Sequence, residues 1–287
     1  MNITKISNLH EYHSHLESNK IALEQLKQLD AKLVNQIKQT PKFYIEGFSW
    51  TAQSESQFLV DMAYADHGQV NIRERLVCQK TKLNNRIRGC IQIFESVFNP
   101  QKDDAIYLTE QRTLLAKWLS KKYHNLIGSE FMEDCSWFTK LKLSIKSFPE
   151  KINHQDLTAL TLPSDYFKFT LSFDCFEHIP NYKKAFSEVY RTLESGGSFL
   201  FSVPFDINSE KTLVRAEICD GEIKHLTEPE YHGNPVSKLG SLSFYTFGWE
   251  LLDELKSIGF KNVYILLFWS EKYANLGGEQ IMICAEK

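Results

Sequence analysis

The chain has 287 residues, of which 43% are hydrophobic and 24% charged, and its formal net charge is -3. This length suits one domain with an extension or two small domains, and the composition is that of a soluble globular protein. The charge balance argues against nucleic acid, and no signal core, long apolar run or basic amphipathic helix indicates a membrane. The scattered cysteines indicate reduced thiols in a cytoplasmic protein.

Residues 1–40 form a predicted N-terminal helical extension. Within residues 9–39, apolar side chains recur on one stripe of an otherwise charged helix, which Pro41 ends. The stripe comprises Leu16, Ile21, Leu23, Leu26, Leu29, Leu33 and Ile37. We expect this helix to pack on the rest of the chain or on a second subunit, which would make a homodimer.

Residues 41–100 differ in pattern and predict a small β-hairpin module. Residues 43–50 and 57–62 indicate two short strands joined by a polar turn. Four arginines follow, and they have two interpretations: they bind an anionic substrate or the carboxylate of a cofactor, or they pair at the surface with Glu74 and other acids. They are Arg73, Arg75, Arg86 and Arg88.

Residues 101–287 alternate between apolar strands and amphipathic helices, which predicts a doubly wound α/β fold with a seven-stranded, mostly parallel sheet. The expected helices are 111–122, 182–193 and 250–258, and Gly196-Gly197 and Gly259 should end the last two. An insertion at about residues 206–248 precedes the last helix. The expected strands are 104–110, 125–130, 151–156, 169–173, 198–203, 261–269 and 280–285.

Two motifs in this part carry a family resemblance. Ser172-Phe173-Asp174 is followed by Glu177-His178-Ile179-Pro180, and after the helix comes Leu193-Glu-Ser-Gly-Gly-Ser-Phe-Leu-Phe-Ser-Val-Pro204. The combination resembles the fourth-to-fifth strand region of class I S-adenosylmethionine (SAM)-dependent methyltransferases, with Ser195 in place of the usual proline. The resemblance implies a Rossmann-like fold, SAM as cofactor and methyl transfer as the reaction.

The hairpin module resembles one that precedes some bacterial methyltransferase domains. The resemblance is carried by Arg73-Glu-Arg-Leu-Val-Cys78 and Leu83-Asn-Asn-Arg86. In that subgroup two Cys-x-x-Cys pairs flank the hairpin, a spacing suited to tetrahedral zinc. Only one cysteine remains here, because the corresponding residues are Ser49, Ala52, Cys78 and Thr81. We therefore expect no zinc in this module.

The resemblance places cofactor-binding residues after successive strands, where open α/β sheets bind ligands. It implies that Glu130 accepts the ribose hydroxyls and that Asp156 and the Leu157 N–H meet the adenine. It also implies that residues after the fourth strand line the methionine and adenine side: Asp174, Cys175, Phe176, Glu177 and His178.

The first turn departs from the family pattern. Residues 108–113 read Leu-Thr-Glu-Gln-Arg-Thr, with no glycine where the family has Gly-x-Gly-x-Gly. In one interpretation Glu110 takes the amino group of SAM and Arg112 or a nearby arginine takes its carboxylate. In the other, the turn is blocked and the domain serves another purpose.

Candidate catalytic residues lie in the insertion. The stretch from His225 to Pro235 mixes imidazoles, carboxylates and aromatics, and His232 or His225 is a candidate base, with His178 a third. Glu228, Tyr231 and His232 together make a site in this stretch more plausible than any single histidine would. A metal held by His225, Glu228 and His232 has compatible spacing but no other support, so the sequence predicts no metal.

The sequence therefore favours SAM-dependent methyl transfer to the oxygen or nitrogen of a small-molecule or sugar-like acceptor. One alternative is a non-catalytic methyltransferase-like scaffold whose N-terminal helix mediates dimerisation. The other is an enzyme whose pocket has been repurposed for a different cofactor or a metal.

Overall fold

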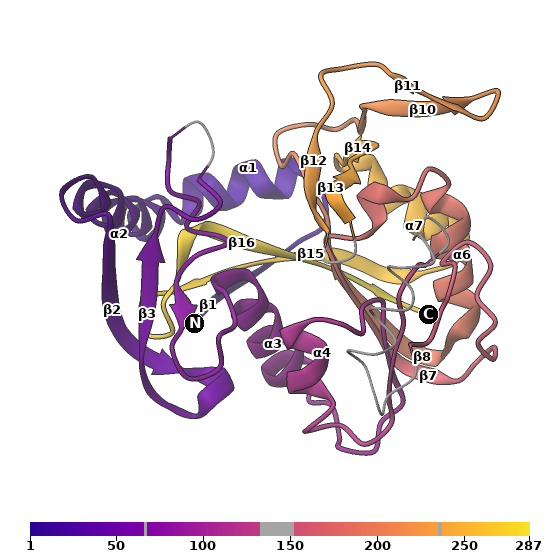
Figure 1. Ribbon diagram of the computed structural model, residues 1–287, viewed down its shortest axis with the longest axis horizontal. Coiled ribbons are helices and arrows are strands. Elements are labelled where there is room, and N and C mark those ends of the chain that lie inside the picture. Colours follow the sequence, from indigo (N-terminus) through magenta and orange to yellow (C-terminus); the bar gives the residue numbers. More distant parts are fainter. Residues whose placement is uncertain (66–67, 133–151, 235–236) are drawn as a thin grey trace. The chain divides into compact units, whose positions relative to one another are not determined.

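The computed structural model describes residues 1–65, 68–132, 152–234 and 237–287 (Figure 1). It divides into two compact units, one of residues 1–100 with 265–282 and the other of residues 101–264 with 283–287. Within the described residues, no helix is both long enough and apolar enough to cross a membrane.

A seven-stranded mixed sheet confirms the predicted α/β class. Its strands, in spatial order, are β1 (Asn2–Ile6), β15 (Lys261–Ser270), β16 (Asn275–Glu286), β8 (Leu193–Ser202), β7 (Phe167–Phe173), β5 (Ile106–Leu108) and β6 (Leu126–Gly128). Strands β6, β5, β7 and β8 pair in parallel, whereas β16 pairs antiparallel with β8 and β1 antiparallel with β15. The boundary between the two units falls within β15 and β16.

One predicted strand is replaced by another. Of the strand expected at 151–156, residue 151 lies outside the described residues, and residues 152–156 form only a single β-bridge, between His154 and Glu130. The seventh strand is instead β1, whose residues run antiparallel from Asn2 opposite Trp269 to Ile6 opposite Ile265. A five-residue segment gains strand structure only from a partner far along the chain, so its own pattern did not reveal it.

The sequence predicted that the Gly-Gly pair ends the preceding helix, and this prediction is wrong. Helix α6 (Tyr182–Thr192) has Leu193 as its C-cap, and β8 begins at that residue. The register of β8 against β7 shifts between Leu193 and Ser198, so the glycines lie in this irregular stretch. Gly196 has a φ of +78°, and a Cβ on Gly197 would lie 2.9 Å from the Phe167 carbonyl oxygen. The glycines therefore permit a bulge in the strand.

Helices cover the parallel part of the sheet. They are α4 (Leu114–Leu119), α6 and α7 (Glu250–Ile258), and Gly259, with a φ of +123°, caps α7 as predicted. Beneath α6, Phe176 stacks on Phe186 with ring centroids 4.5 Å apart, and Phe199 stacks on Phe201 at 4.2 Å. This aromatic core fixes the short 3₁₀ turn Phe176–His178 that follows β7.

The insertion forms small antiparallel sheets (Figure 1). Its strands are β9 (Leu213–Val214), β10 (Ala216–Cys219), β11 (Glu222–His225), β12 (Tyr231–Asn234), β13 (Ser237–Leu242) and β14 (Tyr245–Thr246). β10 pairs with β11, β12 with β13 and β9 with β14. The Phe244 N–H donates to the Glu177 carbonyl oxygen at 2.7 Å, so the insertion is anchored to the turn after β7.

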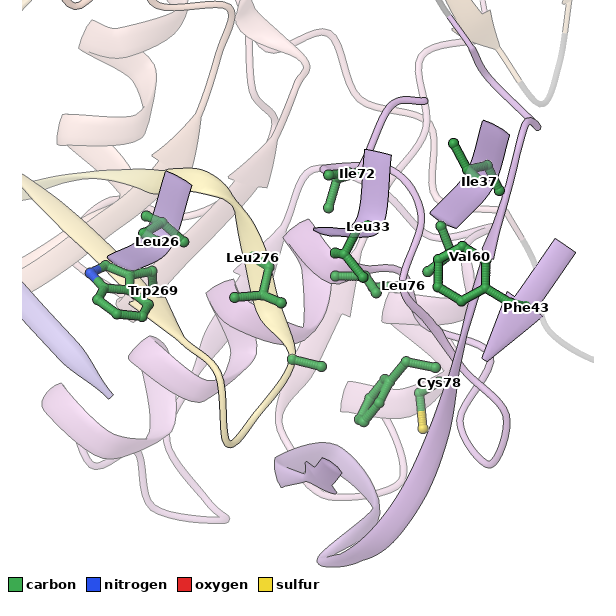
Figure 2. Packing of buried hydrophobic residues seen from close by; sticks show 12 residues of the cluster. Leu26, Leu33, Ile37, Phe43, Val60, Ile72, Leu76, Cys78, Trp269 and Leu276 are labelled. Carbon is green, nitrogen blue, oxygen red and sulfur yellow. The ribbon is translucent and has the colours of Figure 1, made fainter. Parts of the chain in front are cut away.

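The first unit contains helices α1 (Leu9–Ser18), α2 (Lys20–Gln39) and α3 (Asn85–Val97), and a sheet of β2 (Lys42–Ser49), β3 (Ser54–Asp61) and β4 (Val77–Cys78). The predicted hairpin is confirmed as β2 and β3. The single predicted N-terminal helix is wrong at Asn19, which separates α1 from α2. Part of the predicted apolar stripe, Leu26, Leu33 and Ile37, is buried in one cluster with hairpin residues (Figure 2).

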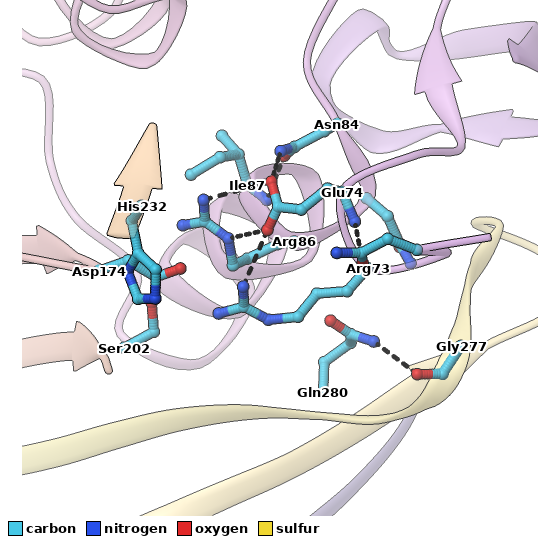
Figure 3. A network of polar contacts seen from close by, with 12 residues as sticks. Arg73, Glu74, Asn84, Arg86, Ile87, Asp174, Ser202, His232, Gly277 and Gln280 are labelled. Carbon is cyan, nitrogen blue, oxygen red and sulfur yellow. Dashed lines mark hydrogen bonds and ion pairs between the residues drawn. The ribbon is translucent and has the colours of Figure 1, made fainter. Parts of the chain in front are cut away.

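The four arginines of this unit support the interpretation of structural pairing. Glu74 accepts hydrogen bonds from Arg73 and from Arg86, each at 2.8 Å (Figure 3). Arg75 pairs with Asp61 at 2.6 Å. Arg88 is buried, and its guanidinium donates to three backbone carbonyls, those of Leu76, Tyr273 and Ala274.

Cys78, the one cysteine at the positions that correspond to zinc ligands in the related module, is surrounded by hydroxyl groups. The Ser49 and Ser56 hydroxyls both lie 3.3 Å from the Cys78 sulfur, and Thr51 bonds Thr81 at 3.2 Å. Burial opposes ionisation of Cys78, but hydrogen bonds from Ser49, Ser56 and Thr81 outweigh it and lower the pKa of the thiol to about 7. A hydrogen-bonded cluster thus links β2, β3 and the chain after β4.

Candidate active site

The glycine-free first turn follows β5 and lies tightly against β6. A Cβ on Gly128 would be 2.9 Å from the Glu110 carbonyl oxygen and 3.3 Å from the Gln111 Cα. The glycine that allows close approach therefore stands on the neighbouring strand rather than in the turn itself. On the other side, the Thr109 hydroxyl donates to the Ser172 hydroxyl of β7 at 2.7 Å.

Glu130 organises this turn. One of its carboxylate oxygens accepts the backbone N–H groups of Gln111 at 3.0 Å and of Arg112 at 2.7 Å. In the usual glycine-rich turn such N–H groups face the ligand, whereas here a charged side chain already uses them. A ligand carboxylate at this turn would therefore need a side-chain partner.

The Asp156 side chain also bonds the neighbouring backbone. The next residue, Leu157, is half-buried. One Asp156 carboxylate oxygen accepts the Thr158 N–H at 2.7 Å and the Thr158 hydroxyl at 2.9 Å. This is the pattern of an Asx turn, in which the side chain fixes the backbone two residues further on.

The end of β7 brings the first turn and the insertion into one region. Asp174 has a φ of +52° and accepts the Ser202 hydroxyl of β8 at 2.7 Å. The pKa of the next residue, Cys175, is raised to about 12, first by burial, then by the nearby carboxylate of Glu177 and also by that of Glu110. Both carboxylates therefore lie close enough to Cys175 to act on its thiol.

Glu177 is the centre of a polar cluster. Its side chain is completely buried, and its Oε1 lies 3.3 Å from His232 Nδ1 and 3.6 Å from His178 Nε2. The two imidazole rings meet edge to face, with centroids 5.1 Å apart. The cluster joins the turn after β7 to β12 of the insertion.

In each histidine, the ring nitrogen that faces away from Glu177 has a polar partner of its own. His178 Nδ1 lies 2.8 Å from the Leu242 carbonyl oxygen, and His232 Nε2 lies 2.9 Å from a carboxylate oxygen of Glu230. Contact with Glu177 first, and then with Glu230, raises the pKa of His232 to about 9, and burial raises the pKa of Glu177. These groups together therefore favour a positive charge in the cluster. When no other cation supplies it, His232 carries a proton of its own and does not accept another.

The structure thus brings together only part of the predicted catalytic set. His178 and His232 meet, but His225 is exposed on β11, Glu228 is exposed, and the Tyr231 side chain is 56% exposed. Among the described residues, the one group with metal-ligand geometry is Glu177, His178 and His232, not the spacing-based set of His225, Glu228 and His232.

Sequence reasoning did not single out the two carboxylates that face His232. Glu177 was placed only on the cofactor side, although its position beside His178 was a signal. Glu230 lies two residues before His232, directly ahead of β12, and alternate residues of an extended chain share a face, so its position was a second signal.

One part of the chain matches a known protein family. Residues 112–201 match the family model of a methyltransferase domain. A search of curated proteins found no match.

Solved structures show only distant likeness. A SAM-dependent methyltransferase from Mesorhizobium loti is 15% identical, with 70% of this chain and 100% of that chain covered and a TM-score of 0.46. A possible histamine N-methyltransferase from Thermotoga maritima is 14% identical, with 69% and 89% covered and a TM-score of 0.41. The 1,6-didemethyltoxoflavin-N1-methyltransferase of Burkholderia thailandensis is 15% identical, with 70% and 78% covered and a TM-score of 0.40. Such values bear on neither the acceptor nor the site residues.

The matched residues run from the first turn through β8, the region that holds the strand ends described above. Over these residues the chain is therefore similar to a methyltransferase domain.

Proposed function

We propose that the protein transfers a methyl group from SAM to a hydroxyl oxygen of a small, sugar-like molecule that enters beside Glu177. The observation that carries the proposal is that the end of β7 contacts both regions: Ser172 bonds Thr109 of the first turn, and Glu177 holds Phe244 of the insertion. Glu110 belongs to the turn that meets the methionine end of SAM in this class of domain, and Glu177 belongs to the cluster at the insertion. Donor and acceptor would therefore meet after β7.

The residues of the first turn fit the methionine end of SAM in charge. We assign the amino group of SAM to the Glu110 carboxylate and its carboxylate to the Arg112 guanidinium, since Glu130 already accepts the backbone N–H groups of Gln111 and Arg112. The second carboxylate oxygen of Glu130 would accept a ribose hydroxyl. Asp156 and the Leu157 N–H would meet the adenine beyond it.

Methyl transfer from a sulfonium is an in-line displacement, so the main contribution of the chain is to position the nucleophile and to exclude water. A hydroxyl acceptor must also lose its proton, and the buried polar cluster is where that hydroxyl would be oriented. The insertion supplies one wall, because β12 carries His232 and the Leu242 carbonyl holds His178. N-methylation stays a second candidate, since the same wall could receive an amine.

The proposal is tested by calorimetric titration of the full chain with SAM and with S-adenosylhomocysteine, followed by an assay of S-adenosylhomocysteine release with sugars, phenols and amines as acceptors. We expect saturable binding of both ligands, weakened by Glu110→Gln and by Asp156→Ala. Glu222→Gln, an exposed change on β11, is the control for both experiments. Absence of binding by the folded wild-type protein would contradict the proposal and favour a scaffold role.

A further inference from the structure

We propose that Glu177, His178 and His232 together bind one divalent metal ion, for which zinc is the best match. The inference concerns the metal alone and stands whether or not the acceptor proposed above is correct. It goes against the sequence-based expectation of a protein without a metal.

The spacing of the three ligand atoms suits a metal. The candidate atoms are Glu177 Oε1, His178 Nε2 and His232 Nδ1, and such atoms of the three residues lie within 4.8 Å of one another. Both histidine nitrogens are already 3.3 and 3.6 Å from Glu177 Oε1. Zinc bonds of about 2.0–2.1 Å in a tetrahedron place neighbouring ligand atoms about 3.3 Å apart. The two distances from Glu177 Oε1 to the histidine nitrogens therefore already lie within a few tenths of an ångström of this spacing.

The tautomer of His178 leaves its inner nitrogen without a hydrogen. The Leu242 carbonyl oxygen can only accept a hydrogen bond, so His178 Nδ1 must carry the proton in their 2.8 Å contact. In the neutral ring Nε2 then presents a lone pair toward the Glu177 carboxylate. Two acceptors facing each other repel unless a proton or a cation lies between them.

His232 repeats this arrangement with the nitrogens reversed. Its Nε2 faces a Glu230 carboxylate oxygen at 2.9 Å and so carries a hydrogen, which leaves Nδ1 toward Glu177. The other Glu230 oxygen is held by Arg215 at 2.9 Å. A carboxylate or carbonyl on the outer nitrogen is the usual support for a metal-bound histidine, because it fixes the tautomer and the ring orientation.

The burial of Glu177 is the independent observation that points to a ligand. Its side chain has 0% exposure. Apart from the ion-pair contacts with the two histidines, neither carboxylate oxygen has a hydrogen-bond partner among the described residues. An ionised carboxylate without donors is costly to bury, whereas coordination of a metal offsets that cost.

Two histidines and a carboxylate leave a coordination position open, as in catalytic rather than structural zinc sites. On the proposed function, an acceptor hydroxyl or a water would occupy that position beside the methyl donor. A metal there stabilises an alkoxide oxygen, which prepares the hydroxyl for attack. The alternative is that the cluster holds only a proton, shared between His232 and Glu177.

The test is a cobalt titration of chelator-treated, full-length protein, followed by visible absorption, with zinc competition. We expect one cobalt ion per chain, displaced by zinc, with a spectrum of nitrogen and oxygen ligands and no thiolate charge-transfer band. His232→Asn and Glu177→Gln should each weaken cobalt binding by more than about tenfold, and Glu230→Gln by about 10–100-fold. The matched control is His225→Asn, an exposed histidine of the same insertion, which should leave the affinity unchanged.

Cys78→Ser excludes binding at the hairpin thiol, and circular dichroism of each metal-free variant establishes that it folds. Because His232 is partly exposed on a hairpin strand, His232→Asn is the variant expected to fold best. No binding, a thiolate spectrum, or affinity unchanged by both His232→Asn and Glu177→Gln would overturn the proposal and leave a proton in the cluster. Cobalt binding without SAM binding would instead refute the proposed function and leave the metal site intact.

Discussion

Glu130 should stabilise the first turn as well as take part in cofactor binding. Its Oε1 accepts two backbone N–H groups, at 3.0 and 2.7 Å, and hydrogen bonds to charged groups contribute about 1.5–3 kcal/mol each. The side chain is half-buried, so water replaces part of the lost interaction. We therefore expect Glu130→Ala to lower the free energy of unfolding by about 2 kcal/mol, which corresponds to a fall of roughly 4–8 °C in Tm for a domain of this size.

Glu130→Gln is the matched variant, because it keeps one acceptor oxygen and removes the charge. It should lose less than about 1 kcal/mol of stability, since neutral hydrogen bonds remain. Both variants should weaken SAM binding if the second oxygen meets the ribose. Thermal denaturation and calorimetric titration separate the two effects. Equal stability losses in both variants, or no loss in Glu130→Ala, would refute the assigned role in the turn.

Three further predictions concern packing, ionisation and a buried charge. Gly128→Ala places a methyl group against the backbone of the turn and should cost about 1–3 kcal/mol in urea denaturation, whereas Gly233→Ala, with open space around it, should cost almost nothing; equal costs would contradict the packing argument. The pKa of Cys78 is lowered to about 7 in the folded chain from an ordinary value of 9.0, so its thiolate stabilises the fold above pH 9 and that stabilisation is lost as pH falls through 7. The difference in unfolding free energy between wild type and Cys78→Ser should therefore grow from pH 7 to pH 9, and a flat difference would disprove the shift. Arg88→Lys cannot reach three carbonyls with one ammonium and should lower the unfolding free energy by about 2–4 kcal/mol, measured by urea denaturation with Lys224→Arg, a surface change, as control. A loss below about 0.5 kcal/mol, the usual range for surface changes, would show that water or neighbouring groups replace the guanidinium.

The local sequence pattern was sufficient to predict the elements whose buried residues all lie within one short segment. The apolar run of β7, the amphipathic face of α6, Gly259 after α7 and the β2–β3 hairpin all follow from neighbouring residues, and the structure has each of them. The motif around Glu177 and the Gly-Gly segment likewise indicated the class of the domain, because its strand-end residues are close together in the sequence.

Pairing over long sequence distances decided the rest. Strand β1 exists because it lies against β15, more than two hundred residues later, and the bulge in β8 depends on its register with β7. No window of residues contains both partners of such a pair. The same limit explains the strand predicted at 151–156, because its place in the strand–helix order did not establish a partner.

The candidate site shows this division most clearly. The sequence determined that the residues after β7 are acidic and imidazole-bearing, and that histidines lie in the insertion. Only the tertiary structure decided which histidine meets Glu177, because the Phe244 N–H anchors the insertion at the Glu177 carbonyl and β12 then carries His232, not His225, to the buried carboxylate. The sequence determines which side chains each segment contains. The tertiary structure determines which of them share a site, because burial and hydrogen bonding act between segments that are distant in the sequence.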